Sequence, residues 1–407
     1  MATTEHQRGL DREAAVEHLL THAVADVVVK EDLRRELLGT RPLRVKLGVD
    51  PTRPDIHLGH YVCFRKLREF QALGHQIVVI IGDWTARIGD PSGRSVQRQM
   101  LSEEEVRRNA QTYLDQFFKV VDVDRAEIRW QSTWYNDFTL ADVIHLTSKY
   151  TVAQMLARED FAKRFNEGSP IAITELLYPL LQAYDSVAVE ADVEIGGTDQ
   201  TFNLLVGRDI QREMGQRPQN ILTVPLLVGT DGVQKMSKSF DNYIAVNDPP
   251  EEMFGKIMSI PDSLLGDYYR LLTDVPESEI TSMLDAAARG EVNPRDLKER
   301  LGMIIVTDLH SAEDAEAARE AFDRVYRRRE LPEDMPEVAV PREERILPLL
   351  ITAGMARTNN EARRLVTQGG VRLGGERVID PEATVTINAP TVLQVGKRRF
   401  VRLVPKG

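Results

Sequence analysis

The sequence predicts an α/β protein with a parallel sheet, a helical domain and a small α+β domain at the C-terminal end. Short apolar runs such as Ile77–Ile81 alternate with stretches of helical spacing, as in βαβ units. From Pro249 to about Arg329 the spacing is helical throughout. A proline-containing stretch then separates this helical region from the last sixty or so residues, which have their own pattern of short helices and strands.

The elements follow in order. Residues 9–38 have helical apolar spacing and end near Gly39, and Leu43–Val49 is a candidate buried strand. Beyond Gly59, apolar residues recur every three or four positions and predict a helix, and Val78–Ile81 is the next strand. Strand, helix and strand in this order form a right-handed parallel unit. Such sheets bind ligands at the carboxyl ends of their strands, which here include the turn Asp50–His57.

The remaining sequence sets the domain boundaries. Residues 101–190 are mainly helical in pattern, most clearly Leu140–Met155 and Thr174–Ala188, and Ile221–Val228 is a further strand. We therefore expect a catalytic domain over 1–230 with a helical insertion at about 120–190. We further expect a loop and helical domain over 231–330. A linker over 331–343 should follow it and lead to a C-terminal domain over 344–407.

Composition favours a cytoplasmic protein of two or three domains. No basic segment followed by an apolar one opens the 407-residue chain, and its apolar runs are too short to cross a membrane. The single cysteine, Cys63, excludes an internal disulfide and a cysteine-built metal site.

Charge is unevenly distributed. The net charge is −11, yet residues 345–407 hold eleven Lys/Arg and four Asp/Glu, which leaves about −18 for the rest. This basic end indicates a confined contact with a polyanion, although a solvated basic face would look the same.

The first motif with chemical meaning is His57-Leu58-Gly59-His60, which follows Gly48-Val49-Asp50-Pro51-Thr52. At a helix start the two imidazoles join the free backbone N–H groups and the positive end of the helix dipole, which suits phosphate. Gly59 lets a base or ribose approach the backbone. Two histidines alone are more often structural, and a metal site is a weaker interpretation because no further ligands complete the shell.

The second motif is Lys235-Met236-Ser237-Lys238-Ser239, within the polar segment Gly229–Asn242. Two lysines with hydroxyls between them suit a mobile clamp on a polyphosphate, although such a stretch is often only a solvated loop. The ordered pair of motifs, about 175 residues apart, resembles the HIGH and KMSKS signatures of class I aminoacyl-tRNA synthetases, with Leu58 in place of isoleucine.

A third group of residues concerns the amino-acid substrate. Tyr178, Gln182 and Asp185 are spaced i, i+4 and i+7 on a predicted helix, so they share a face. Two Gly-containing turns, Gly196-Gly197-Thr198-Asp199-Gln200 and Ile88-Gly89-Asp90-Pro91-Ser92-Gly93, add polar side chains. A helix with one polar stripe and an ordinary turn are the alternatives.

Together these segments resemble the substrate pocket of bacterial tyrosyl-tRNA synthetases, and the resemblance covers essentially the whole chain. It implies a Rossmann-like catalytic domain in which Tyr178, Gln182 and Asp90 hold the ammonium group of L-tyrosine. It further implies that Asp185 accepts from the phenolic hydroxyl and that Gln200 lies near the carboxylate. For ATP it implies Gly197 and Asp199 at the ribose, Asp50 at the α-phosphate, and Thr52, His57 and His60 along the triphosphate and sugar.

Two positions depart from the family pattern. Lys46 stands where a second tyrosine usually contacts the substrate hydroxyl, so either Lys46 or a group elsewhere supplies that contact. Cys63 stands where a threonine often lies near the ribose, and a packed structural cysteine is an equal alternative.

The tail supplies the RNA-binding candidates. Ile346–Ala353 and Asn360–Gly369 read as short helices, followed by the strand Val371–Leu373. The core Asn-x-Ala-Arg-Arg-Leu-x-x-x-Gly-Gly-Val resembles the S4 RNA-binding module. That resemblance assigns tRNA phosphate contacts, which orient the RNA rather than read it, to basic residues of the tail: Arg363, Arg364, Arg372, Lys397, Arg398 and Arg399.

The resemblance implies tyrosyl-adenylate formation and transfer of tyrosine to tRNA(Tyr), by a homodimer with its interface around 120–190. Mg2+ would arrive with ATP rather than in a protein-built site. Tryptophanyl-tRNA synthetase and a nucleotidylyltransferase are the enzymatic alternatives, and a non-catalytic RNA-binding paralogue is the third. The interval between the signatures is too short for an editing domain, which agrees with tyrosine as substrate.

Overall fold

The computed structural model describes residues 2–52, 56–91, 101–326, 335–396 and 399–406. The chain divides into two compact units, Met1–Arg319 and Glu320–Gly407. Of the helices in the described ranges, none is long and apolar enough to cross a lipid bilayer.

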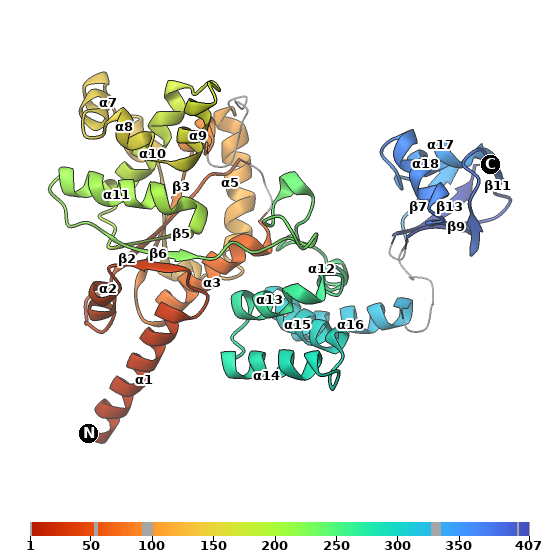
Figure 1. Cartoon of the computed structure of the whole chain (residues 1–407), viewed down its shortest axis with the longest axis horizontal. Coiled ribbons are helices and arrows are strands. Elements are labelled where there is room, and N and C mark those ends of the chain that lie inside the picture. Colours follow the sequence, from red (N-terminus) through yellow and green to blue (C-terminus); the bar gives the residue numbers. More distant parts are fainter. Residues whose placement is uncertain (1, 53–55, 92–100, 327–334, 397–398, 407) are drawn as a thin grey trace. The chain divides into compact units, whose positions relative to one another are not determined.

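A six-stranded sheet forms the centre of the first unit, in the order β1-β6-β5-β2-β3-β4 (Figure 1). β2 to β6 run parallel, and β1 pairs antiparallel with β6 at one edge. All of Ile77–Ile81 in β3 is buried, as expected for a strand covered on both faces. The strands are β1 (Asp26–Val28), β2 (Arg44–Val49), β3 (Gln76–Ile81), β4 (Ala126–Trp130), β5 (Val193–Gly197) and β6 (Asn220–Val224).

Helices connect these strands. α3 links β2 to β3 and α11 links β5 to β6, while α10 packs against α11. The helices of this part are α1 (Ala2–Thr21), α2 (Lys30–Leu37), α3 (Leu58–Ala72), α4 (Thr85–Ile88), α5 (Glu103–Phe117), α6 (Ser132–Tyr135), α7 (Leu140–Thr147), α8 (Val152–Met155), α9 (Glu159–Asn166), α10 (Ile173–Ala188) and α11 (Thr201–Glu213). α7 to α10 gather on one side of the unit (Figure 1).

A helical group completes the first unit and packs on α3. The hydroxyl of Tyr61 and the guanidinium of Arg68, both on α3, bond to Asp308. This helical group is therefore tied to the helix that begins at the histidine motif. It consists of α12 (Pro250–Ile257), α13 (Leu265–Leu272), α14 (Glu277–Ala288), α15 (Pro294–Leu309) and the first part of α16 (Ala312–Tyr326), since the unit boundary falls within α16 after Arg319.

The second unit has its own core. A five-stranded sheet, ordered β10-β9-β12-β13-β7, and a two-stranded sheet of β11 and β8 accompany two short helices. Buried apolar residues such as Leu349, Val366, Val371 and Leu403 form the core. The elements are β7 (Glu337–Val340), β8 (Glu343–Arg345), α17 (Ile346–Thr352), α18 (Asn359–Thr367), β9 (Val371–Leu373), β10 (Glu376–Val378), β11 (Thr384–Thr386), β12 (Thr391–Val395) and β13 (Arg399–Pro405).

Three elements differ from the sequence-based expectation. The helical pattern over 9–38 is interrupted by β1, where Asp26–Val28 pairs with the sheet edge. β4 lies inside the segment that was expected to be helical. Its strand conformation is stabilised by pairing with β3, which the local sequence does not show. The expected linker 331–343 contains β7, which pairs in parallel with β13, and residues 331–334 lie outside the described ranges.

Candidate active site

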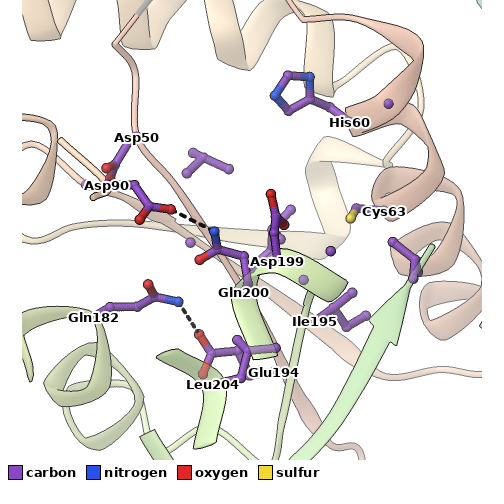
Figure 2. A pocket seen from close by; sticks show the side chains of 18 of the residues that line it. Asp50, His60, Cys63, Asp90, Gln182, Glu194, Ile195, Asp199, Gln200 and Leu204 are labelled. Carbon is purple, nitrogen blue, oxygen red and sulfur yellow. Dashed lines mark hydrogen bonds between the residues drawn. The ribbon is translucent and has the colours of Figure 1, made fainter. Parts of the chain in front are cut away.

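A cavity of about 360 Å3 opens at the carboxyl ends of β2 and β5 (Figure 2). The turn after β2, the start of α3, one face of α10 and the lysine-containing loop after β6 all contribute to its lining. The structure therefore brings together most of the candidate residues, namely Asp50, His57, Gly59, His60, Cys63, Asp90, Tyr178, Gln182, Asp185, Gly197, Asp199, Gln200 and Lys235.

Asp50 is positioned by its strand and by an adjacent glycine. Its carboxylate accepts from the Thr85 hydroxyl at 2.6 Å and from the Tyr178 hydroxyl at 2.9 Å. A Cβ atom on Gly82 would lie 2.2 Å from Asp50 Oδ1 and 2.3 Å from Thr85 Oγ1. Glycine at this position is therefore required by the hydrogen bond that fixes Asp50, a role that the sequence pattern did not reveal.

The two histidines form a reciprocal cap on α3. His57 Nδ1 accepts from the Gly59 N–H at 3.2 Å, and the His57 N–H donates to His60 Nδ1 at 3.3 Å. Each Nδ1 is therefore an acceptor, so a neutral imidazole carries its proton on Nε2. Both histidines line the cavity, and this tautomer provides each ring with one N–H donor.

The electrostatic environment keeps both imidazoles neutral. Burial, followed by the charge of Lys238, lowers the pKa of His60 to about 4. Burial also lowers the pKa of His57, and His60, Lys238 and Lys235 add to that effect. At neutral pH the histidines are thus hydrogen-bond donors rather than cations, and the lysines supply the positive charge.

Asp185 offers an unused acceptor. Its Oδ2 accepts from Gln131 Nε2 at 2.7 Å, while its Oδ1 is buried and has no hydrogen-bond partner among the described residues. Burial raises the pKa of this carboxyl to about 7, and nearby Lys46 opposes the shift. A buried acceptor without a partner is costly, so this atom is suited to receive a donor from a bound ligand.

Gln131 lines the cavity, although no motif in the sequence marks it. Its side-chain oxygen accepts from the backbone N–H groups of Trp84 and Thr85, and its amide donates to Asp185. The residue follows β4, itself an unpredicted strand, so no motif marked it.

Asp90 supplies another carboxylate to the cavity lining. Gln200 Nε2 donates to Asp90 Oδ2 at 2.7 Å (Figure 2). Arg158 Nη2 lies 3.4 Å from Asp90 Oδ1. The Gln182 side-chain oxygen is buried without a hydrogen-bond partner among the residues described. Asp90, Gln182 and the Tyr178 hydroxyl together present acceptors to a cationic group.

Lys46 lies outside the cavity lining and is held by three partners. Its Nζ lies 2.9 Å from the backbone carbonyl oxygen of Gln182, 2.8 Å from Ser186 Oγ and 2.9 Å from Glu194 Oε1, so all three N–H donors are used. Lys46 is fully buried and is not part of the cavity lining, whereas Glu194 is. Of the two alternatives, a contact from Lys46 or one from a group elsewhere, this position favours the second, because Lys46 packs against α10 as the partner of the buried Glu194 carboxylate.

The lysine-containing loop meets the cavity from the β6 side. Lys235 Nζ pairs with Asp199 Oδ2 at 2.8 Å. Lys238 begins a short 3-10 helix, and its effect on the pKa of both histidines places its charge near them. Neither Lys238 nor Thr52 contributes to the lining of this cavity.

Cys63 lines the cavity one turn beyond His60, and burial raises the pKa of its thiol to about 12. The thiol is therefore protonated at neutral pH and is not a nucleophile.

The candidate RNA-binding residues of the second unit lie on its surface. Arg363, Arg364, Arg372 and Arg399 are exposed. Arg363 pairs with Glu382 at 2.6 Å, and Arg399 donates to the Met355 carbonyl at 3.0 Å. Lys397 and Arg398 lie outside the described residues.

Comparison with known families identifies two matching segments. Residues 38–327 match the family described as tRNA synthetases class I (W and Y), and residues 328–403 match a Tyrosine--tRNA ligase SYY-like C-terminal domain. The first match spans both signature motifs and the whole cavity lining.

Similar proteins cover nearly the full chain. A Tyrosine--tRNA ligase of Dehalococcoides mccartyi is 55% identical over 96% of this chain and 99% of its own. One from Thermotoga maritima is 55% identical over 95% of this chain and 96% of its own. Among solved structures, Archaeoglobus fulgidus tyrosyl-tRNA synthetase complexed with L-tyrosine is 25% identical, with a TM-score of 0.61 over 75% of this chain and 99% of that one.

Proposed function

The chain belongs to the bacterial tyrosyl-tRNA synthetases of class I, and we propose that its cavity binds L-tyrosine and ATP side by side. As a member of that family it activates L-tyrosine with ATP, producing tyrosyl-adenylate and pyrophosphate. It then transfers tyrosine to the 3′ end of tRNA(Tyr). The roles of individual residues below are our proposal.

The unpartnered Oδ1 of Asp185 is the observation that supports tyrosine as the amino acid. A phenolic hydroxyl can donate to this oxygen, whereas phenylalanine would leave the buried acceptor unsatisfied. Tyrosyl-tRNA synthetases are themselves the standard example of this discrimination, in which a hydroxyl-binding site rejects phenylalanine strongly without editing. Gln131 holds Asp185 in place through its other oxygen.

The ammonium group of the substrate would lie among Asp90, Gln182 and the Tyr178 hydroxyl. Asp90 supplies the charge, and Gln182 supplies a buried carbonyl oxygen that has no partner among the described groups. Gln200, which already donates to Asp90, would lie near the substrate carboxylate. This arrangement leaves the carboxylate directed toward the ATP side of the cavity.

ATP would occupy the part of the cavity between α3 and β5. Gly59 and Gly197 allow close approach of the nucleotide, and a Cβ atom on Gly197 would come within 2.8 Å of Asp199 Oδ1. Asp199 would bind the ribose and Asp50 would lie beside the α-phosphate. The Nε2–H groups of His57 and His60, with Thr52, would donate along the triphosphate and sugar.

The reaction requires positioning and charge stabilisation. A carboxylate oxygen of tyrosine attacks the α-phosphorus, a new P–O bond forms, and the bond to pyrophosphate breaks. Lys235 and Lys238 would stabilise the charge that develops on the leaving pyrophosphate. Mg2+ would enter bound to ATP and help neutralise the same phosphates. In the second step a terminal ribose hydroxyl of tRNA attacks the acyl carbon and releases AMP.

ATP–pyrophosphate exchange tests this assignment. We expect exchange that depends on L-tyrosine and is absent with L-tryptophan or L-phenylalanine. Exchange with tryptophan alone would support the tryptophanyl enzyme, and no exchange with any amino acid would support a non-catalytic RNA-binding protein. Cytoplasmic location follows the proposed role in translation.

The pH dependence of tyrosine use should report Asp185. Its pKa in the folded protein is about 7, so it is increasingly protonated as pH falls below that value. A protonated carboxyl loses the charge that strengthens its bond to the phenolic hydroxyl. We expect kcat/KM for tyrosine in pyrophosphate exchange to fall through this range, and the Asp185→Asn variant to lose this component of the profile.

Asp185 should also oppose folding at high pH. Because its pKa rises from 3.8 to about 7 on folding, ionisation costs the native state stability between these pH values and above them. Asp185→Asn should therefore raise the free energy of unfolding at pH 8 by roughly 2–4 kcal/mol. Denaturant unfolding at pH 4 is the control, because there the gain should vanish. An equal gain at both pH values would contradict the assignment.

The second unit would bind tRNA. The exposed arginines on α18, β9 and β13 would contact phosphates, which contribute affinity without reading sequence. An Arg364→Glu variant should raise KM for tRNA in aminoacylation by roughly fivefold or more, while pyrophosphate exchange stays unchanged. Arg289→Glu, an exposed charge reversal on the first unit, is the matched control. Equal losses in both variants would indicate a general charge effect.

A homodimer is supported by exposed apolar side chains on α7 to α10. Leu140, Ile144, Val152, Phe165 and Ile173 are 59–78% exposed, an unusual concentration for a surface that faces water. We therefore place the subunit interface here, within the region 120–190.

Sedimentation velocity tests this interface. We expect the wild-type chain to sediment as a dimer and a Val152→Asp, Ile173→Asp double variant to sediment as a monomer. Ile379→Asp places the same charge on an exposed apolar residue of the second unit and should leave the dimer intact. A double variant that remains dimeric would place the interface elsewhere.

A further inference from the structure

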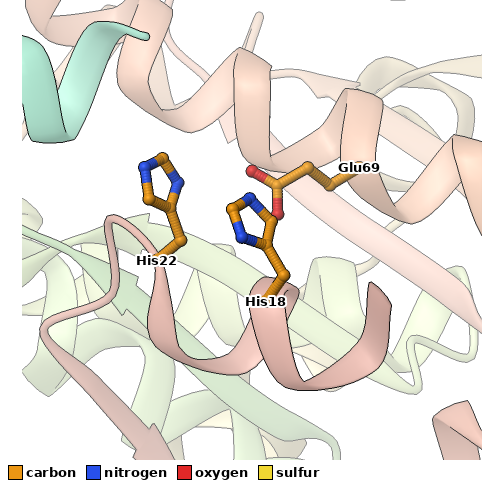
Figure 3. Close-up of side chains that lie close together, drawn as sticks. All are labelled: His18, His22 and Glu69. Atoms are coloured by element: carbon orange, nitrogen blue, oxygen red, sulfur yellow. The ribbon is translucent and has the colours of Figure 1, made fainter. Parts of the chain in front are cut away.

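We propose that His18, His22 and Glu69 form a binding site for a divalent transition-metal ion such as Zn2+, outside the substrate cavity (Figure 3). One potential ligand atom from each residue lies within 4.8 Å of the other two. None of the three residues lines the cavity at the end of the sheet. The site therefore goes beyond the proposed aminoacylation function.

The helical geometry of α1 brings the two imidazoles together. His22 donates its backbone N–H to the His18 carbonyl at 2.8 Å, so helical geometry continues past Thr21 and the two residues are one turn apart. Their rings stack with centroids 4.5 Å apart. Glu69 approaches from α3, on the opposite side of the gap (Figure 3).

The donor set suits a transition metal. Two imidazole nitrogens and a carboxylate oxygen form the ligand set of several three-ligand zinc sites, in which water completes the shell. Ligand atoms about 2.1 Å from one tetrahedral ion lie roughly 3.4 Å from one another. The three ligand atoms must therefore move closer together, and the exposed His18 side chain must change rotamer so that its ring no longer stacks on His22 and its nitrogen faces the ion. Imidazole ligands favour Zn2+, Ni2+ or Co2+ over Mg2+ and Ca2+.

The imidazole of His22 is available to bind a ligand. Both of its ring nitrogens are buried and lack a hydrogen-bond partner among the described residues. Burial, aided by the charges of neighbouring basic groups, lowers the pKa of His22 to about 4. The imidazole is thus neutral at pH 7, which is the form that binds a metal.

A neighbouring lysine limits the expected affinity. Lys66 Nζ pairs with Glu69 Oε2 at 2.8 Å and donates to the carbonyls of Leu19 and His22 at 3.1 and 2.6 Å. Its charge repels a second cation, but a carboxylate has two oxygens, and Glu69 can use Oε1 for the metal. The negative end of the α1 dipole also lies here and favours positive charge. We therefore expect binding weaker than at a structural zinc site.

Metal binding by the full-length chain tests the proposal. Untagged protein stripped with EDTA is titrated with Zn2+ by calorimetry, without ATP or Mg2+. We expect a site whose affinity falls by about tenfold or more in His18→Ala and in Glu69→Gln. His145→Ala removes another exposed histidine, on α7, and should bind Zn2+ as the wild type does.

A structural readout separates this site from adventitious binding. X-ray absorption of the Zn2+ complex should show two imidazole ligands in the wild type and one fewer in His18→Ala. Because His18 is exposed, this variant should fold normally, as circular dichroism of the metal-free protein would verify. Failure of the wild type to bind Zn2+, or unchanged binding in His18→Ala, would overturn the proposal whatever the outcome of the pyrophosphate-exchange assay.

Discussion

Replacing Lys46 with methionine is expected to lower the free energy of unfolding by about 3–5 kcal/mol. Lys46 and Glu194 have 0% and 1% of their side chains exposed, and their charged atoms lie 2.9 Å apart. The substitution keeps the apolar stem of the side chain but removes the ammonium group. Glu194 would then be buried without its cation, which is costly in a low-dielectric interior.

The same substitution should damage tyrosine binding. Glu194 Oε1 accepts from the Gln182 side-chain amide at 3.3 Å, and Lys46 Nζ donates to the backbone carbonyl of Gln182. Lys46 also opposes the upward pKa shift of Asp185. Without Lys46 we expect a higher KM for tyrosine and an acid limb of the pH profile that moves to higher pH.

Denaturant unfolding of a double variant distinguishes loss of the ion pair from loss of packing. Lys46→Met with Glu194→Gln removes both charges and leaves an amide that can still bond to Ser186 and Gln182. We expect the double variant to recover much of the stability lost in Lys46→Met. A double variant as unstable as the single one would show that packing, rather than an unpaired charge, dominates.

Replacing Lys238 with alanine is expected to lower kcat for pyrophosphate exchange by roughly 100- to 1000-fold. The charge of Lys238 is close enough to His57 and His60 to lower the pKa of both. In the proposed mechanism this charge stabilises the leaving pyrophosphate, a contribution that is largest in the transition state.

Equilibrium binding provides the control for Lys238. Lys238 is not part of the cavity lining and is proposed to act on the leaving pyrophosphate, so tyrosine affinity measured by calorimetry should stay within about twofold of wild type. Lys30→Ala, which removes an exposed lysine on α2, should leave kcat unchanged. If Lys238→Ala weakened tyrosine binding and left kcat intact, the lysine would act in binding rather than in catalysis.

Local patterns in the amino-acid sequence were enough to predict the fold class and most of the residues that line the cavity. The apolar run Ile77–Ile81 and the three- or four-residue spacing of apolar residues after Gly59 are strong local patterns, and β3 and α3 lie where those patterns predicted. The spacing of Tyr178, Gln182 and Asp185 by i, i+4 and i+7 likewise required one helix face, and all three line the cavity. Regular elements allow this because their periodicity fixes the direction of each side chain.

Features that depend on contacts between residues distant in the chain could not be predicted from local patterns. β4 gains its stability from pairing with β3, so its own sequence did not identify it, and Gln131 was missed with it. The position of Lys46 depends on Glu194, which lies 148 residues later. A lone buried lysine has no local signature that tells a substrate contact from an ion pair, because burial and charge partners are set by packing between elements. Packing also placed Glu69 beside His18 and His22, which no spacing in the sequence could show.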